Sequence, residues 1–409
     1  MPRLPGANEA AGLPTGLQMN PKGPVQSGEA PVTTRAMDDA EVRAPSRIPE
    51  LDGLRGLAIA LVLIWHYGVI LLPVGSAGRR LADRWLWFFW SGVDLFFVLS
   101  GFLIAGILLD QKHSRRYFST FFTRRACRIL PVYYLTLALF FIGSRTVRLP
   151  TPAEAWLWGD RPALWSYFAF LQNWTMAFEG RFGPNAIAAT WSLAVEEQFY
   201  LLLPLMVRLF SRRHLLGVAM ASIVVAPSAR VFLDQHIDRV ADFVLLPGRI
   251  DSLAWGVLLA VCVRNASARS ALERHRVARR TLLGLVWAFV LSIDGDFLPG
   301  QYVHSLLALG YGLLLAEVLG AGGAGRLVGL LRWPMLRWLG LGSFSLYLFH
   351  QPLLGLAHGL ILGRDPGLGS AAKNGTTLLA LVLTCLLAAL IYRLIEAPFM
   401  RMGHRRAYH

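Results

Sequence analysis

The stretch LDGLRGLAIALVLIWHYG at residues 51–68 is apolar enough to cross a bilayer, yet it carries ionisable side chains. Asp52 and Arg55 lie near its beginning, and His66 lies past its middle. An ionisable side chain in the bilayer core costs at least about 2.5–3.5 kcal/mol on insertion scales. Each of these residues therefore needs a partner, a wet cavity or a function.

The rest of the chain has the composition of a polytopic helical membrane protein. Of its 409 residues, 55% are hydrophobic and only 16% are charged. Such a composition, with apolar runs near membrane-spanning length, predicts an all-α membrane protein with no soluble catalytic domain. The apolar segments are 51–72, 86–109, 129–143, 164–178, 187–207, 215–233, 248–263, 281–293, 302–320, 341–362 and 376–395.

The excess of basic residues is a feature of the loops. Lys and Arg number 40 against 25 acids, a net charge of +15, and the basic clusters stand between apolar segments. This pattern is typical of cytoplasmic loops and disfavours a nucleic-acid partner, which would need a basic soluble face with interleaved aromatics. Cys127, Cys262 and Cys385 are far apart and form no CxxC pair, so neither a disulfide framework nor a metal site is expected.

Loop charge also decides which segments cross. If all eleven crossed, the basic stretch 208–213 would be external and the acidic stretch 234–242 cytoplasmic, against the positive-inside rule. The segment LWSYFAFLQNWTMAF (164–178) is short for a span, at about 15 residues where roughly 20 are typical. We predict that it lies on the outer surface or re-enters, which leaves about ten spans with both termini cytoplasmic.

Three parts of the chain are predicted. Residues 1–47 are rich in Pro, Gly, Ala and Ser and lack the apolar core of a signal peptide, so we expect a disordered tail. The membrane domain should cover 48–400, and 401–409 should form a short basic cytoplasmic tail.

The first two spans hold several candidate site residues. Arg55 and His66 are eleven residues apart, about 16 Å of helix rise and close to three turns, so they share a face. By themselves they are consistent with a cytoplasmic anchor and a neutral core histidine. Asp94 lies at about the depth of His66, so the two could pair, and Ser100 is near the centre of its span. Gly101, like two other glycines of this span, would allow close helix approach.

Further polar residues lie in later segments. Arg125 and Arg128 stand at the cytoplasmic entry of the third span, where positive-inside bias and a phosphate site explain them equally well. Glu196 and Glu197 are adjacent inside an apolar segment and point about 100° apart, which favours a function. Arg249 and Asp251 could form an outer salt bridge, and His350 could mark the helix kink at Pro352; a substrate contact is equally consistent with all three.

Seven stretches, in this order, resemble the acyltransferase-3 family of bacterial integral-membrane O-acyltransferases. They are LDGLRGLAIALVLIWH, GVDLFFVLSGFLI, RRACRILPVYY, WSLAVEEQFYL, GRIDSLAWG, SLYLFHQP and YRLIEAPF. The resemblance covers nearly the whole chain except the N-terminal tail. The spacing of Arg55 and His66 fits the family's hallmark of an arginine, ten residues and a histidine, and the family's arginine motif falls on Arg125 and Arg128.

The resemblance implies a multi-pass protein of the inner (plasma) membrane with ten helices and no permanently bound cofactor. The implied donor is acyl-CoA, with acetyl-CoA as the first candidate, on the cytoplasmic side. The implied acceptor is a hydroxyl of an envelope polysaccharide, a lipid-linked sugar or a macrolide. Some members append an extracytoplasmic hydrolase-like domain; this chain ends at His409, so we expect transfer to be completed by the membrane domain or by a separate protein.

Acyl transfer needs a base, a stabilised oxyanion and a site that holds both substrates. We expect His66 to be the base, held by Asp94, Glu196 or Glu197. The remaining candidates are Arg55, Arg125 and Arg128 for the CoA phosphates, and Ser100, Arg249, Asp251 and His350 for substrate. A covalent acyl intermediate on His66 or Ser100 is a variant of this mechanism.

A transporter is the alternative function, because intramembrane Asp, Glu and His can relay protons. The lack of internal repeats and the arginine cluster at one mouth disfavour it. Release of CoA from acyl-CoA without a gradient distinguishes an enzyme from a transporter.

Overall fold

The computed structural model of the protein describes residues 48–159, 163–294, 298–320 and 325–408. Within these ranges the chain forms helices and turns and no strand, which confirms the all-α prediction. The predicted tail at residues 1–47 lies outside the described residues.

The ten longest helices of the described ranges each coincide with one of the ten predicted spans. They are α1 (Pro49–Tyr67), α3 (Gly92–Asp110), α4 (Tyr117–Thr146), α9 (Trp191–Leu209), α10 (Arg212–His236), α12 (Leu246–Val263), α14 (Arg276–Ser292), α15 (Gly300–Gly320), α18 (Ser343–Leu362) and α19 (Ala371–Ile391). Helix α4 begins twelve residues before the apolar run 129–143, because the arginines of its first turns interrupt the hydropathy without interrupting the helix.

Shorter elements connect these helices. They are η1 (Val69–Leu71), α2 (Ala77–Trp85), η2 (Trp87–Ser91), α5 (Thr151–Trp158), α6 (Leu164–Phe168), α7 (Gln172–Glu179), α8 (Asn185–Ala188), α11 (Arg239–Val244), α13 (Ala266–Arg274), α16 (Arg326–Leu331), α17 (Pro334–Leu341), the π-helical turn η3 (Tyr392–Glu396) and α20 (Ala397–His404).

Seven helical segments in the described ranges are long and apolar enough to cross a membrane, so the chain is a polytopic membrane protein. The three other predicted spans fall on α9, α14 and α18. Helix α14 has only 17 residues, and α9 carries two glutamates and an arginine. Two histidines and a glutamine lower the hydropathy of α18. Ten crossings therefore stay a prediction.

The segment 164–178 was predicted not to cross the membrane. In the structure it does not form one helix of membrane-spanning length, which agrees with that prediction. It is divided into α6, with five residues, and α7, with eight. Eight helical residues rise about 12 Å, whereas the hydrocarbon core is about 30 Å thick. Between the two helices Phe170 has a φ of 55°, in the left-handed region, which breaks the helical path.

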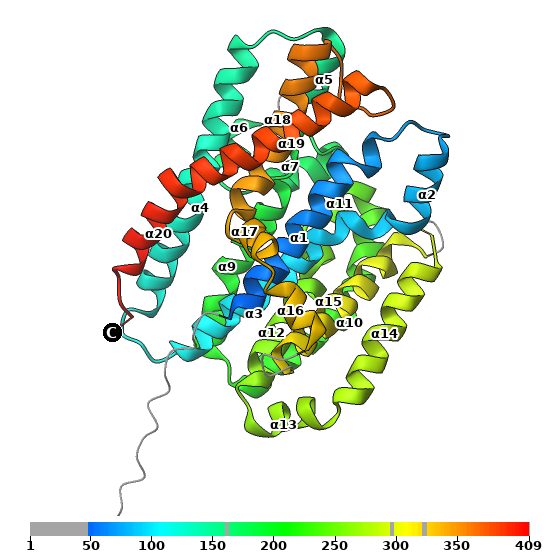
Figure 1. The fold of residues 1–409 in the computed structure, drawn as a ribbon. Coiled ribbons are helices and arrows are strands. Elements are labelled where there is room, and N and C mark those ends of the chain that lie inside the picture. The colour runs from blue at the N-terminus through cyan, green and yellow to red at the C-terminus, as the bar shows by residue number, and fades with distance from the viewer. Residues whose placement is uncertain (1–47, 160–162, 295–297, 321–324, 409) are drawn as a thin grey trace, which may run out of the picture. The chain divides into compact units, whose positions relative to one another are not determined.

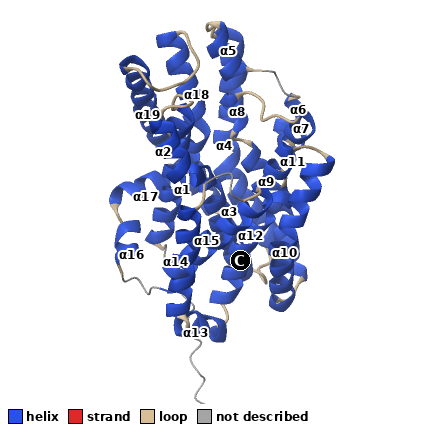
Figure 2. Ribbon diagram, turned by 90° about the vertical axis from the view of Figure 1, so that its right-hand side faces the viewer, coloured by secondary structure: helices blue, strands red, loops and turns tan. Residues whose placement is uncertain are grey.

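Helices α1, α3 and α12 stand in the middle of the bundle, and α4, α10, α14 and α19 stand around them (Figures 1 and 2). Helices α3 and α12 touch through their backbones. A Cβ atom at Gly101 would lie 2.1 Å from the Leu253 carbonyl oxygen, and one at Gly256 would lie 2.2 Å from that of Val98. Only glycine fits at these two positions, which confirms the close approach predicted for Gly101.

Candidate active site

A cavity lies among α1, α3, α4, α9 and α18. Its space, including the mouth that opens to solvent, amounts to about 850 Å³. Apolar side chains form most of its wall, among them Phe96, Phe97 and Ile129. The polar side chains that line it are Arg55, Ser100, Arg125, Arg128, Ser192, Glu196, Tyr200, Ser343 and Tyr347.

Helical spacing brings these polar groups together. Ser192, Glu196 and Tyr200 recur every four residues along α9, so they present one face to the cavity. Arg125 and Arg128 are three residues apart on α4 and share a face in the same way. Glu196 and Glu197 point about 100° apart on α9, and of the two only Glu196 lines the cavity.

Three guanidinium groups from two helices line the cavity. Arg55 donates through Nη2 to Ser343 Oγ at 3.4 Å, and the Arg125 guanidinium carbon lies 5.6 Å from the centre of the Tyr200 ring. Arg128 interacts electrostatically with Arg125 and with Glu396 and Glu196. Clustered guanidinium groups in a water-poor site are suited to phosphate oxygens, which they bind through charge-assisted hydrogen bonds.

Hydroxyl groups and one carboxyl group face the arginines. Ser100 on α3 is hydrogen-bonded to the Tyr200 hydroxyl on α9, and Glu196 interacts with both. Glu197 is turned away from this cavity, and its buried Oε1 has no hydrogen-bond partner. Of the two adjacent acids, Glu196 is therefore the one that a ligand in the cavity would meet.

His66 is not among the residues that line the cavity. Its Nδ1 lies 2.9 Å from the Val62 carbonyl oxygen, which can only accept, so Nδ1 carries the proton and Nε2 keeps a lone pair. Its ring stands edge to face against that of His350, with centroids 4.7 Å apart. His350 is also absent from the cavity lining, but Tyr347, one turn earlier on α18, is part of it.

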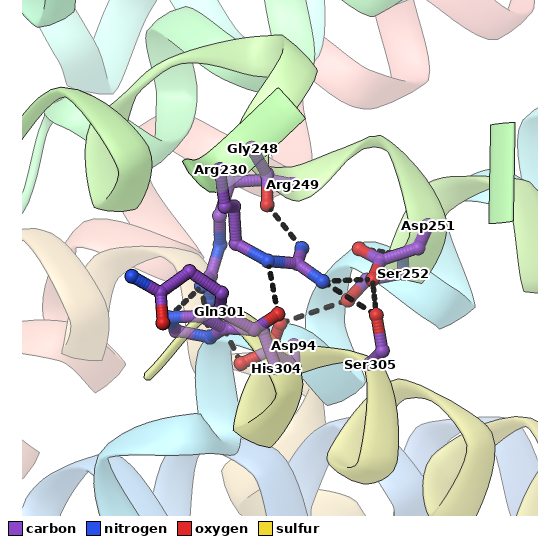
Figure 3. A network of polar contacts seen from close by, with 9 residues as sticks. All are labelled: Asp94, Arg230, Gly248, Arg249, Asp251, Ser252, Gln301, His304 and Ser305. Atoms are coloured by element: carbon purple, nitrogen blue, oxygen red, sulfur yellow. Dashed lines mark hydrogen bonds and ion pairs between the residues drawn. The ribbon is translucent and has the colours of Figure 1, made fainter. Parts of the chain in front are cut away.

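Of the three carboxylates predicted to hold His66, Asp94 is bonded elsewhere. Asp94 Oδ2 accepts from Arg249 Nη2 at 2.8 Å, and its Oδ1 accepts from Ser252 Oγ at 2.8 Å (Figure 3). The physical reason is charge: a fully buried aspartate is better stabilised by a guanidinium group that meets it with a charge-assisted hydrogen bond than by a neutral imidazole.

Arg249 and Asp251, predicted as substrate contacts, are fully buried and do not line the cavity. They also do not pair with each other. Arg249 pairs with Asp94 and contacts His304, and its guanidinium carbon lies 4.9 Å from the centre of the Phe243 ring. These contacts favour the structural explanation, an ion pair, although with a partner from another helix.

Asp251 is held by Arg230, a residue that the sequence analysis did not single out. Arg230 Nη2 lies 3.0 Å from Asp251 Oδ2, and Ser305 Oγ donates to the same oxygen at 2.6 Å. The remaining nitrogens of Arg230 donate to the carbonyl oxygens of Gly248 and Gln301 (Figure 3). An arginine inside the apolar segment 215–233 was the signal that could have indicated this network.

Glu396 is the second residue that sequence reasoning missed. It ends the π-helical turn η3, is buried, and accepts a hydrogen bond from Ser345 Oγ at 3.1 Å. Its strongest charge interaction is with Arg128, followed by one with Arg55. Its place in the stretch YRLIEAPF was the available signal in the sequence, and the structure adds that it ends a π turn, a feature frequent at functional sites.

Several bacterial proteins are similar in sequence to most of this chain. The protein YrhL of Bacillus subtilis is 28% identical over 382 residues, which are 88% of this chain and 56% of YrhL. The peptidoglycan O-acetyltransferase OatA of Listeria monocytogenes is 27% identical over 379 residues, 87% of this chain and 56% of OatA. The O-acetyltransferase OatA of Staphylococcus aureus is 24% identical over 381 residues, 88% of this chain and 58% of that protein.

This chain thus spans little more than half the length of these relatives. Residues 48–393, which include the whole cavity, match the acyltransferase domain Acyl_transf_3. Because the match covers most of the chain, the protein belongs to the acyltransferase-3 family.

Proposed function

We propose that this chain is a membrane O-acyltransferase that moves an acetyl or other short acyl group from acyl-CoA to a hydroxyl of a carbohydrate acceptor. The observation that carries the proposal is the cavity in which Arg55, Arg125 and Arg128 face Glu196 and the Ser100–Tyr200 hydroxyl pair. Peptidoglycan is the first acceptor to test, because the relative from Listeria monocytogenes is named for it. Lipid-linked sugars and macrolides are the next.

The arginines are suited to the phosphates of the donor. In a site that excludes water, each guanidinium–phosphate contact is stronger than on a soluble surface, because the dielectric constant is lower. Positive-inside bias places this end of α1 and α4 at the cytoplasmic face of the plasma membrane. Acyl-CoA would therefore enter from the compartment in which it is made.

The transfer step is assigned to His66. Its tautomer leaves Nε2 able to take the proton of the acceptor hydroxyl, whose oxygen then attacks the thioester carbonyl. As the carbon–sulfur bond breaks, the proton passes from His66 to the CoA sulfur. Arg55 and His66 are separated by about 16 Å of helix rise. An extended donor would therefore keep its phosphates at the arginines while it presents the thioester toward His66.

The test is acyl-CoA turnover by the purified full chain in nanodiscs, with peptidoglycan fragments, lipid-linked sugars and macrolides as acceptors. CoA thiol release and the mass of the acylated product are measured together. We expect both in the wild type, neither in His66→Ala, and weak donor binding in Arg128→Ala. Arg79→Ala is the matched control, because Arg79 forms an exposed ion pair with Asp83 on α2.

The transporter alternative gives a different result in the same experiment. A transporter would release no CoA thiol from acyl-CoA in the absence of a gradient. Wild-type protein that binds no acyl-CoA and releases no CoA with any acceptor would refute the proposed function.

A further inference from the structure

His66 and His350 form a histidine pair, and no carboxylate takes part in it. Each ring has its Nδ1 on a backbone carbonyl oxygen: His66 on Val62 at 2.9 Å and His350 on Tyr347 at 2.6 Å. Because a carbonyl oxygen only accepts, both Nδ1 atoms carry protons and both Nε2 atoms keep lone pairs. The ring centroids are 4.7 Å apart, with an angle of 70° between the planes.

The Nε2 atom of His350 is one of several buried polar atoms that lack a partner. The side chain has no solvent exposure, and its Nε2 has no hydrogen-bond partner among the described residues. A buried acceptor left without a partner destabilises the fold, whereas a phenylalanine would fill the same space without that cost. Packing alone therefore does not explain a histidine here, and the lone pair is available to a positive charge that forms during the reaction.

Hydrogen bonds fix the backbone around the pair. Tyr67, which follows His66, donates to the backbone oxygen of His350 at 2.7 Å. Tyr347 contacts Ser192 Oγ at 2.8 Å through its hydroxyl and lines the cavity. The two imidazoles are therefore held on α1 and α18 by contacts that also reach the wall of the cavity.

We propose that His350 is a positioning residue of the transfer step, whose Nε2 lone pair stabilises the positive charge that His66 gains when it takes the proton of the acceptor hydroxyl. This role rests on the function proposed above. The O–H bond of the acceptor breaks as the N–H bond of His66 forms. The proton then leaves with the CoA sulfur, so neither histidine is changed at the end. His350 thus takes the place of Asp94, one of the three carboxylates expected to hold His66.

Two substitutions of His350 separate this role from packing. His350→Phe keeps a planar ring but removes the acceptor, and His350→Gln places an amide oxygen near the position of Nε2. We expect kcat to fall by about tenfold to a thousandfold in His350→Phe, in line with the contribution of acid–base groups. In His350→Gln kcat should stay within about tenfold of the wild type. The KM for acyl-CoA and the dissociation constant of CoA should not change in either variant.

The control is His358→Phe, on the same helix. His358 is equally buried and, like His350, has one ring nitrogen without a hydrogen-bond partner among the described residues, while its Nε2 bonds Thr377 Oγ1 at 2.9 Å. It differs from His350 in lying about two turns farther along α18, away from the ring contact with His66. This variant should keep the wild-type kcat. A wild-type kcat in His350→Phe would overturn the proposal, as would an equal loss of kcat in the Phe and Gln variants. If the wild type itself transfers no acyl group, the proposed function fails, and this role fails with it.

Discussion

Asp94 on α3 and Arg249 on α12 form an ion pair of 2.8 Å in which neither side chain is exposed to solvent. Two charges taken out of water repay their desolvation only when they stay paired and hydrogen-bonded. Ser252 and His304 supply further polar contacts, and three aromatic rings surround the guanidinium group. The pair joins the two helices in the middle of the bundle and lies behind Phe97, a residue of the cavity wall.

Removal of one partner of this ion pair should therefore destabilise the fold far more than removal of both. We expect Asp94→Ala to lower the free energy of unfolding by about 3–5 kcal/mol, because the Arg249 charge is then left buried without its counter-ion. The double variant Asp94→Leu/Arg249→Met should recover most of that loss. Thermal unfolding in detergent micelles measures both. A single variant as stable as the wild type would contradict the prediction.

Removal of a cavity arginine should weaken donor binding and leave the fold intact. We expect Arg128→Ala to raise the dissociation constant of CoA by about tenfold to a hundredfold, since a hydrogen bond to a charged group contributes about 1.5–3 kcal/mol. Titration calorimetry measures the change. Arg326→Ala, at an exposed position in α16, is the control and should bind CoA as the wild type does. Equal affinities for the two variants would argue against an arginine phosphate site.

The negative charge of Glu396 should weaken binding of the CoA donor. Its carboxyl group interacts with Arg128 and Arg55, the groups that would meet the donor phosphates. We expect Glu396→Gln to lower the dissociation constant of CoA by about threefold to tenfold, because one negative charge near the phosphates is removed. The amide oxygen can still accept from Ser345, so the local structure is kept. Weaker CoA binding would show that Glu396 serves mainly to hold the arginines in place.

The contact between α3 and α12 gives a stability prediction. A Cβ atom at Gly101 would lie 2.1 Å from a backbone oxygen, so Gly101→Ala must push the two helices apart. We expect a loss of about 1–3 kcal/mol in the free energy of unfolding, the usual cost of overpacking. Gly217→Ala on α10 is the control, because nothing lies within 4 Å of its added Cβ. That variant should be as stable as the wild type or slightly more so, since alanine favours helix.

Hydropathy and loop charge predicted the order of the long helices and indicated that 164–178 is not a span, because both depend on the composition of local segments. They could not predict which polar groups meet. Asp94 and Arg249 are 155 residues apart, and His66 and His350 are 284 apart, so each pair is formed only by the packing of helices. Depth along a helix suggested that Asp94 could reach His66, but depth does not determine direction around the helix axis.

Helical spacing accounts for part of the cavity, because it fixes which neighbours on one helix share a face. The arginines, Ser100 and Glu196, which the sequence analysis gave different roles, line the cavity together. Tyr200 could have been found one turn after Glu196 by the same rule. The position of Glu396 could not have been found from helical spacing. A π turn shifts the face that every later residue presents, and the sequence pattern does not reveal that shift.

The glycine contact also limits how the substrate range of this protein could be changed. Helices joined backbone to backbone cannot be moved apart by a change of side-chain rotamer, so the α3–α12 pair has a fixed width. Engineering for a bulkier acyl chain or acceptor should therefore leave this pair untouched. Space can be gained instead by shortening side chains on the opposite walls, such as Ile129 on α4, Leu193 on α9 and Phe344 on α18.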